Sequence, residues 1–343
     1  MLKDVTIRNF RCFDELWAKE LRQINLLVGA NGTGKTAFLE ALYLLVGGGP
    51  VGAVNLRGMR GLPGGAQLLL SGTGFRGFWS DLFHHFDGKS AIILGGTGPG
   101  IWNRELKIAY QGDQLLLPAS GTKEFASEPL QFLYKVDGRE HSIPVKVTEA
   151  GVQVSPVLEP VLGKLIGAGA IHGSSLAEMF SELSKTNKEK PVVDCIRRCF
   201  PQIEDISVGA EAGTTLLYAS VRSIPERKLP VELVSAGILK FLNILLSVAV
   251  TNGGVVLVDE LENGVYFEQL PAVCSALLEF SKAFDVQLFA TTHSRELVNA
   301  FADVSGEEDI CLLRAKRING ACQIHQFSGT VLRGAVEEEV EFR

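Results

Sequence analysis

The spacing of apolar and polar residues predicts a strand, a second strand and a helix near the start of the chain. Residues 5–11 alternate like a half-buried strand, and the apolar run Ile24–Val28 stands before a helical pattern over residues 37–42. Glycine then crowds residues 47–77, which also carry three arginines. Long glycine-rich stretches are usually mobile or functional, so we expect a long loop here, either a flexible connector or a segment that contacts a partner.

Short apolar runs separated by turn residues follow in the next hundred residues. Asp137-Gly138-Arg139 is one such turn, and Gln111-Gly112-Asp113 is another. Runs of this kind predict an antiparallel meander. They cover residues 91–94, 105–110, 115–117, 132–136 and 143–147.

The second half of the chain changes to an α/β pattern. Helical spacing over residues 176–183 and 192–200 comes first, and residues 216–221 have the pattern of a strand. From residue 234 helices and strands alternate, over residues 238–250, 255–258, 270–284 and 286–290.

A phosphate-binding motif of the form GxxxxGK[ST] separates the run Ile24–Val28 from the helix after it. Its residues are Gly29, Ala30, Asn31, Gly32, Thr33, Gly34, Lys35 and Thr36. In this strand–turn–helix context, backbone N–H groups and a helix N-terminus surround the phosphates of a nucleotide. We expect Lys35 to reach the β- and γ-phosphates and the Thr36 hydroxyl to ligate Mg²⁺.

Two apolar runs in the second half end in polar residues that suit triphosphate chemistry. Residues 255–258 lead into Asp259 and Glu260, and a buried parallel strand would present both carboxylates at its C-terminal edge. We expect Asp259 to hold Mg²⁺ through water and Glu260 to orient and deprotonate the attacking water. The run over 286–290 leads to His293, which could bond to the γ-phosphate. Each motif alone is also compatible with an ordinary strand end.

Ser235 stands where the long apolar helix over 238–250 begins, as an N-cap residue would. Together with Gly237 it predicts a second anion site at a helix start. In a head-to-tail dimer this site would close over the γ-phosphate that the partner chain holds. The alternative is an ordinary capped helix.

Length, composition and charge limit the number of domains and the classes of partner, but they do not change the motif assignments above. The chain has 343 residues, 46% of them hydrophobic, and a formal net charge of −6, which is typical of one large lobed domain or two small ones. The acidic balance argues against a surface built mainly for nucleic acid, although a local basic patch could hold DNA. We find no membrane span, signal peptide or disulfide pattern, and therefore expect a cytoplasmic protein in which Cys195 and Cys199 are reduced core thiols.

The ordered motifs resemble a known group of proteins. The segments IRNFR, GANGTGKT, VSAG, VVLVDELENG and TTHS are similar to the ABC-type ATPase heads of the RecF, SMC and OLD (overcoming lysogenization defect) group, and most of all to the OLD-like AAA-family ATPases of bacteria. The resemblance implies an α/β P-loop NTPase of ABC-ATPase-head type, with a mixed central sheet, an antiparallel β subdomain and a small helical lobe. Residues 1–343 would then form one head, with a phosphate-loop lobe and meander at 1–150, a helical insert at 151–233, a signature, Walker B and His-switch lobe at 234–330, and a tail at 331–343.

The resemblance also implies site residues. Ser235 and Gly237 match the ABC signature motif, which acts in trans, and residues 261–264 match the D-loop. Arg11 matches an arginine that contacts nucleotide phosphate, with a surface strand arginine as the alternative. The chain departs from the pattern in reading VSAGI where the signature usually reads LSGGQ, and no Q-loop glutamine is assigned. We expect no Toprim nuclease domain, which OLD proteins usually carry, in the 50 residues after His293.

The motifs therefore predict an ATP- and Mg²⁺-dependent ATPase that works as a homodimer or a higher homo-oligomer. By resemblance, it would control a separately encoded effector, for instance a Toprim-type nuclease, in antiviral defence or DNA maintenance. A RecF-like DNA-binding ATPase of recombination and repair is the alternative. A GTPase is disfavoured because Asn187-Lys188-Glu189-Lys190 fails the NKxD pattern at its last position, and a transporter subunit because the signature is not standard.

Overall fold

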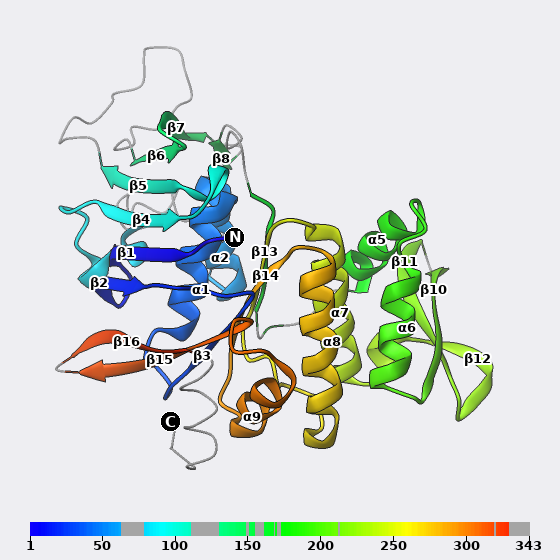
Figure 1. The fold of residues 1–343 in the computed structure, drawn as a ribbon. Coiled ribbons are helices and arrows are strands. Elements are labelled where there is room, and N and C mark those ends of the chain that lie inside the picture. The colour runs from blue at the N-terminus through cyan, green and yellow to red at the C-terminus, as the bar shows by residue number, and fades with distance from the viewer. Residues whose placement is uncertain are drawn as a thin grey trace. The chain divides into compact units, whose positions relative to one another are not determined.

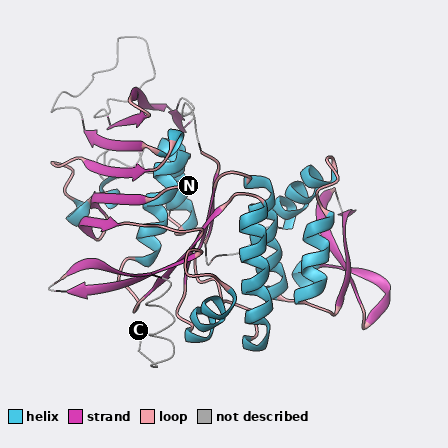
Figure 2. Cartoon of the chain, viewed as in Figure 1, coloured by secondary structure: helices cyan, strands magenta, loops and turns pink. Residues whose placement is uncertain are grey.

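The structure is a computed structural model in which the chain forms two compact units (Figures 1 and 2). It describes residues 1–62, 79–110, 130–148, 151–154, 161–167, 169, 173–211, 213–318 and 320–328. Unit 1 contains Met1–Leu21, Gly29–Gly163 and Leu313–Gln326, and unit 2 contains Arg22–Val28, Lys164–Leu312 and Phe327–Arg343. The predicted strand over 115–117, the predicted turn over 111–113 and the tail over 331–343 lie outside the described residues.

Unit 1 is built on a seven-stranded sheet; its strands β4 to β7 correspond to runs of the predicted meander, whereas β8 was not predicted. The sheet order is β2-β1-β4-β5-β6-β7-β8, with antiparallel pairing between neighbours (Figure 1). Asp137 and Gly138, with φ of 46° and 81°, form the two-residue turn between β6 and β7, as an Asp-Gly pair in a primed turn does. The strands are β1 (Asp4–Phe10), β2 (Phe13–Ala18), β4 (Ile92–Thr97), β5 (Arg104–Tyr110), β6 (Leu130–Val136), β7 (Arg139–Thr148) and β8 (Gly151–Val154).

Two helices joined by a π-type turn belong to unit 1, and they correct the loop expected over residues 47–77. Helix α1 (Lys35–Tyr43) confirms the predicted helix, and α2 (Gly49–Met59) occupies the first part of the predicted loop. Burial of Ala53 and Leu56, and the bond from the Gly49 N–H to the Tyr134 hydroxyl at 3.1 Å, hold α2 in place. Tertiary packing here overrides the weak helix propensity of a glycine-rich segment. The rest of the predicted loop, from residue 63, lies outside the described residues.

Unit 2 contains a parallel sheet, as the alternating pattern predicts. Strands β3 (Ile24–Val28), β14 (Gln287–Thr291), β13 (Val255–Val258) and β9 (Gly163–Ile166) are neighbours in that order. Leu288 pairs with Ile24 on one side and with Val256 on the other, all in parallel register. Strand β15 (Ile310–Ile318) begins in unit 2 and continues into unit 1, where β16 (Ala321–Ser328) is its neighbour.

Helices pack against this sheet to form the hydrophobic core of unit 2. The predicted helices and the strand at β11 are confirmed, whereas β10 and β12, on either side of β11, were not predicted. Cys195 and Cys199 are buried and free, as expected. The elements are α5 (Gly173–Ser184), α6 (Lys190–Cys199), β10 (Ile203–Glu211), β11 (Thr214–Val221), β12 (Ile224–Pro230), α7 (Ala236–Thr251), α8 (Leu270–Ala283) and α9 (Arg295–Val304). Among the described residues, none of the helices has both the length and the apolar character that crossing a membrane requires.

Candidate functional site: a phosphate loop and an acidic strand end

The loop over Gly29–Thr36 has the backbone conformation that its glycines predict. Gly29, Gly32 and Gly34 have φ of 141°, 74° and 97°, values that residues with a side chain rarely adopt. A Cβ on Gly29 would also lie 2.2 Å from the carbonyl oxygen of Ala315, so the loop is too close to β15 for any larger residue. The loop therefore depends on glycine both for its turn and for its packing.

Lys35 begins helix α1 and is bonded to the loop that precedes it. Its Nζ donates to the carbonyl oxygens of Gly29 at 2.7 Å and Ala30 at 3.0 Å, and the Thr33 hydroxyl donates to Ala30 at 2.8 Å. Residues 30–32 and Thr36 are exposed. A curled glycine-rich backbone at the start of a helix, with a lysine held across it, fits the phosphate groups of a nucleotide.

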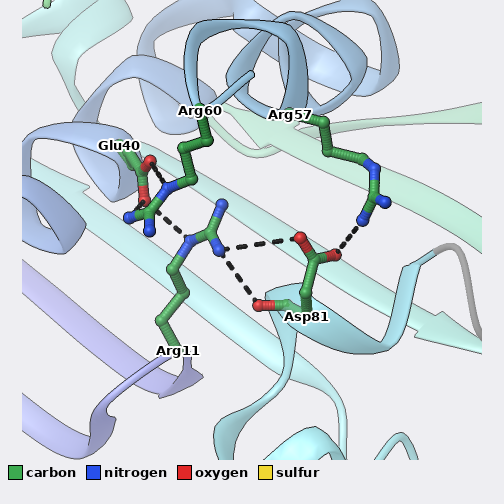
Figure 3. Close-up of polar contacts among 5 residues, drawn as sticks. All are labelled: Arg11, Glu40, Arg57, Arg60 and Asp81. Atoms are coloured by element: carbon green, nitrogen blue, oxygen red, sulfur yellow. Dashed lines mark hydrogen bonds and ion pairs between the residues drawn. The ribbon is translucent and has the colours of Figure 1, made fainter. Parts of the chain in front are cut away.

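Arg11 lies in a buried cluster of ion pairs in unit 1 (Figure 3). It follows β1, and its guanidinium contacts Glu40 of α1 at 2.7 Å and the Asp81 main-chain oxygen at 3.2 Å. Glu40 also binds Arg60 through two hydrogen bonds of 2.7 and 3.0 Å, while Arg57 contacts Asp81 at 2.9 Å. Three arginines thus share two carboxylates.

The Glu40 and Arg11 side chains of this cluster are almost completely buried. The side chain of Glu40 is 3% exposed and that of Arg11 is 10% exposed, so Arg11 is not the surface strand arginine of the alternative interpretation. Burial lowers the pKa of Arg11 while the charge of Glu40 raises it, and a guanidinium stays protonated under any physiological condition. The predicted contact between Arg11 and a nucleotide phosphate remains a proposal.

In unit 2, Asp259 and Glu260 follow the last residue of β13, as the sequence predicts. Thr291, at the end of the neighbouring strand β14, connects them: its hydroxyl donates to Asp259 Oδ1 at 2.5 Å and accepts the Glu260 N–H at 2.8 Å. The carboxylate of Glu260 accepts a hydrogen bond from Asn263 Nδ2. The two acids are therefore fixed at the C-terminal edge of a parallel sheet, where ligands of α/β proteins bind.

Glu260 has an unusual backbone. Its φ of 52° lies in the left-handed region, which costs a residue with a side chain about 1–2 kcal/mol. Lys240 of α7 donates to the carbonyl oxygens of both Asp259, at 2.9 Å, and Glu260. Burial lowers the pKa of the Lys240 ammonium, and the charges of Glu262, Glu260 and Asp259 act in the opposite direction. Strained backbone of this kind clusters at functional sites.

His293 lies on the loop between β14 and α9, and its side chain is exposed. Its N–H donates to the Glu262 carboxylate at 2.7 Å, which ties it to the segment that follows Glu260. Ser294 caps α9 by accepting the Leu297 N–H at 3.1 Å. The histidine is thus positioned by its main chain, and its ring faces solvent.

Ser235 is the N-cap residue of α7, as predicted, but within the described part of the chain its hydroxyl makes no capping hydrogen bond. Gly237 packs against the segment predicted as the D-loop, because a Cβ at Gly237 would lie 1.9 Å from the Gly264 carbonyl oxygen. Gly264 has φ of 81°. The start of α7 and residues 261–264 are therefore in direct backbone contact.

Sequence reasoning missed three residues that organise these two sites: Glu40, Lys240 and Thr291. Lys240 carried a weak signal, since it is the one charged residue of the largely apolar helix α7. Thr291 begins the TTHS segment but was given no role of its own, and Glu40 has an ordinary position in α1, so only the tertiary contacts show their roles.

Comparisons with known proteins find similarity to ATPases. Residues 1–55 match the family model described as "AAA ATPase domain", and residues 178–299 match "AAA domain, putative AbiEii toxin, Type IV TA system". A protein of Helicobacter pylori named "ATP/GTP phosphatase" is 22% identical over 341 residues, which cover 90% of each chain.

Solved structures of SMC heads share the fold. An SMC head bound to the C-terminal winged-helix domain of ScpA superposes with a TM-score of 0.53 at 12% identity, covering 95% of this chain and 98% of that one. The Pyrococcus furiosus SMC head with an extended coiled coil, bound to the C-terminal domain of ScpA, gives a TM-score of 0.52 at 10% identity and 99% coverage of each chain. The chain is therefore an ATPase with AAA-family sequence segments on a P-loop fold of the SMC-head type.

Proposed function

We propose that the chain is an ATP-driven molecular switch that closes as a homodimer around ATP and Mg²⁺ and controls a separately encoded effector. The observation that supports it most is the loop Gly29–Thr36, whose left-handed glycines and Lys35 form a phosphate cradle at the start of α1. The acids at the end of β13, held by Thr291, support hydrolysis rather than binding alone.

Each predicted site residue has a role in this proposal. Lys35 binds the β- and γ-phosphates, and Glu260 orients the attacking water and accepts its proton. Thr36 and Asp259 would hold Mg²⁺, which neutralises phosphate charge when bound. That these residues act on one nucleotide is inferred from the order of the motifs in the sequence. His293 and Arg11 contact phosphate oxygens, and Ser235 with Gly237 acts on the nucleotide of the partner chain.

The setting of the switch is proposed from the comparisons. The family model that matches residues 178–299 names a toxin of a type IV TA system, which supports a role in defence. The SMC head in the similar structure binds a domain of ScpA, which supports control of a partner protein by an ATPase of this fold. ATP-driven closure would change the surfaces that such a partner binds.

ATP turnover by two variants tests the proposal. Lys35→Ala should lose ATP binding, and Glu260→Gln should bind ATP but hydrolyse it about a hundredfold or more slowly, because the general base is lost. Glu226→Gln makes the same chemical change on the exposed strand β12 and should turn over ATP like the wild type. Wild-type turnover by either site variant would refute the proposal.

The partner is identified with the Glu260→Gln protein held on ATP. Affinity capture from the native host should recover one protein with ATP and lose it with ADP. Duplex DNA is the other ligand to test: ATP-dependent binding that weakens steeply with salt would favour the RecF-like alternative over an effector protein.

A further inference from the structure

Lys240 is a buried lysine on the side of α7 that contacts the end of β13. The residue is 6% exposed, and its Nζ donates to the main-chain oxygens of Asp259, at 2.9 Å, and Glu260. Lysine is almost never fully buried unless it is paired, because removing an ammonium from water is costly. Here the hydrogen-bond partners of Lys240 are the main-chain carbonyls of Asp259 and Glu260, which directly follow the end of β13.

The main chain of Glu260 is held from two sides. Thr291 accepts its N–H at 2.8 Å, and its carbonyl oxygen accepts hydrogen bonds from Lys240 and from the Asn263 N–H, the latter at 3.1 Å. The left-handed φ of 52° persists only if the surroundings enforce it. Of these three groups, Lys240 is the one that comes from α7.

The first turn of α7 contacts the same segment. Gly237 lies so close to Gly264 that a Cβ would be 1.9 Å from its carbonyl oxygen. Helix α7 therefore touches residues 259–264 at two points, first by backbone packing and then, one turn later, through Lys240. A shift of the start of α7 would move the support of Glu260.

We propose that Lys240 is a positioning residue that couples the start of α7 to the direction of the Glu260 carboxylate. This proposal rests on the proposed function, because it takes Glu260 as the group that orients water. In this role Lys240 keeps Glu260 aimed only while α7 holds its place against residues 259–264. Lys240 then governs turnover and leaves the affinity for ATP unchanged.

Steady-state kinetics of Lys240→Met test this. Methionine keeps an unbranched apolar stem and removes the donors, so kcat should fall about ten- to a hundredfold while KM for ATP stays within about twofold. Lys240→Arg should recover most of the turnover, because a guanidinium can donate to both carbonyls. Lys185→Met, at an exposed residue in the turn that follows α5, is the matched control and should have wild-type kinetics.

A double variant separates positioning from general damage. In the Glu260→Gln background, Lys240→Met should cause no further loss, because the group that it positions is already absent. Wild-type kcat for Lys240→Met, or a full additional loss in the double variant, would overturn the proposal. If Glu260→Gln itself keeps wild-type turnover, the proposed function fails instead.

A second substitution covers the case in which Lys240→Met does not fold. Lys240→Gln carries a polar group whose amide ends one bond short of the Nζ position, and it should lower kcat at unchanged KM. A wild-type kcat for a folded Lys240→Gln protein would also overturn the proposal.

Discussion

At the residue scale, Glu40 is the carboxylate on which the buried Arg11 of unit 1 depends. It contacts both Arg11 and Arg60, and its side chain is 3% exposed. Glu40→Gln would leave the buried guanidinium of Arg11 to share the Asp81 carboxylate with Arg57. Removing one partner of a buried ion pair typically costs about 3–5 kcal/mol, so we expect unit 1 to lose stability by about that amount.

Tryptophan fluorescence during urea unfolding measures this loss. Trp17, Trp79 and Trp102 are the three tryptophans of the chain, and all lie in unit 1, so their signal reports on that unit. Glu15→Gln, in the exposed pair with Arg8, is the control and should leave the midpoint almost unchanged. Equal midpoints for the Glu40 and Glu15 variants would show that the buried cluster adds nothing to stability.

The same cluster shows where residue-level prediction ends. The local pattern around Gly29–Thr36 predicts its own conformation, because glycine spacing decides which φ values the loop can adopt. Arg11, Glu40 and Asp81 are separated by 29 and 41 residues along the chain, so only folding brings them together. Sequence motifs could name Arg11, but they could not name the carboxylates that bind it.

At the scale of elements, glycine conformation decides how the β6–β7 hairpin and helix α2 respond to mutation. Gly138 has φ of 81°, whereas Gly58 in α2 has no left-handed φ, and a Cβ at either position would meet nothing within 4 Å. Gly138→Ala should therefore destabilise unit 1 by about 1–2 kcal/mol through backbone strain alone. Gly58→Ala should stabilise it by about 0.5–1 kcal/mol, because alanine restricts the unfolded chain.

Urea midpoints from tryptophan fluorescence compare the two variants directly. Because both side chains would stand in open space, opposite signs can come only from backbone conformation. A midpoint that does not fall in Gly138→Ala would contradict the primed turn at Asp137-Gly138, and a midpoint that falls in Gly58→Ala would contradict helical backbone at Gly58.

The elements that the pattern missed share a physical cause. Strand β12 is exposed over most of its length and β10 over much of its second half, so neither shows the strong alternation that burial imposes on β11. Helix α2 has a glycine-rich sequence and depends on buried contacts such as Leu56. The α/β strands β3 and β13 were predicted at their observed bounds because every residue in them is buried and all except Asn25 are apolar.

At the scale of the whole molecule, the proposed dimer makes each active site depend on two chains. Lys35 would act on the nucleotide of its own chain, whereas Ser235 would act on that of the partner. A Lys35→Ala protein and a Ser235→Glu protein should each be inactive alone. The glutamate should leave α7 folded, since acidic side chains suit a helix start, but it would repel a γ-phosphate.

Mixing the two inactive proteins then restores activity if the sites are shared. In an equimolar mixture half of the dimers contain one chain of each kind, and one of their two sites combines an intact Lys35 with an intact Ser235. Turnover should therefore recover to about a quarter of the wild-type rate. Recovery should disappear on dilution below the dissociation constant of the dimer. Catalysis by single chains would not depend on dilution in this way. If the Ser235→Glu protein is active alone, or the mixture stays inactive while sedimentation shows mixed dimers, Ser235 does not act across a dimer interface and α7 serves only its own chain.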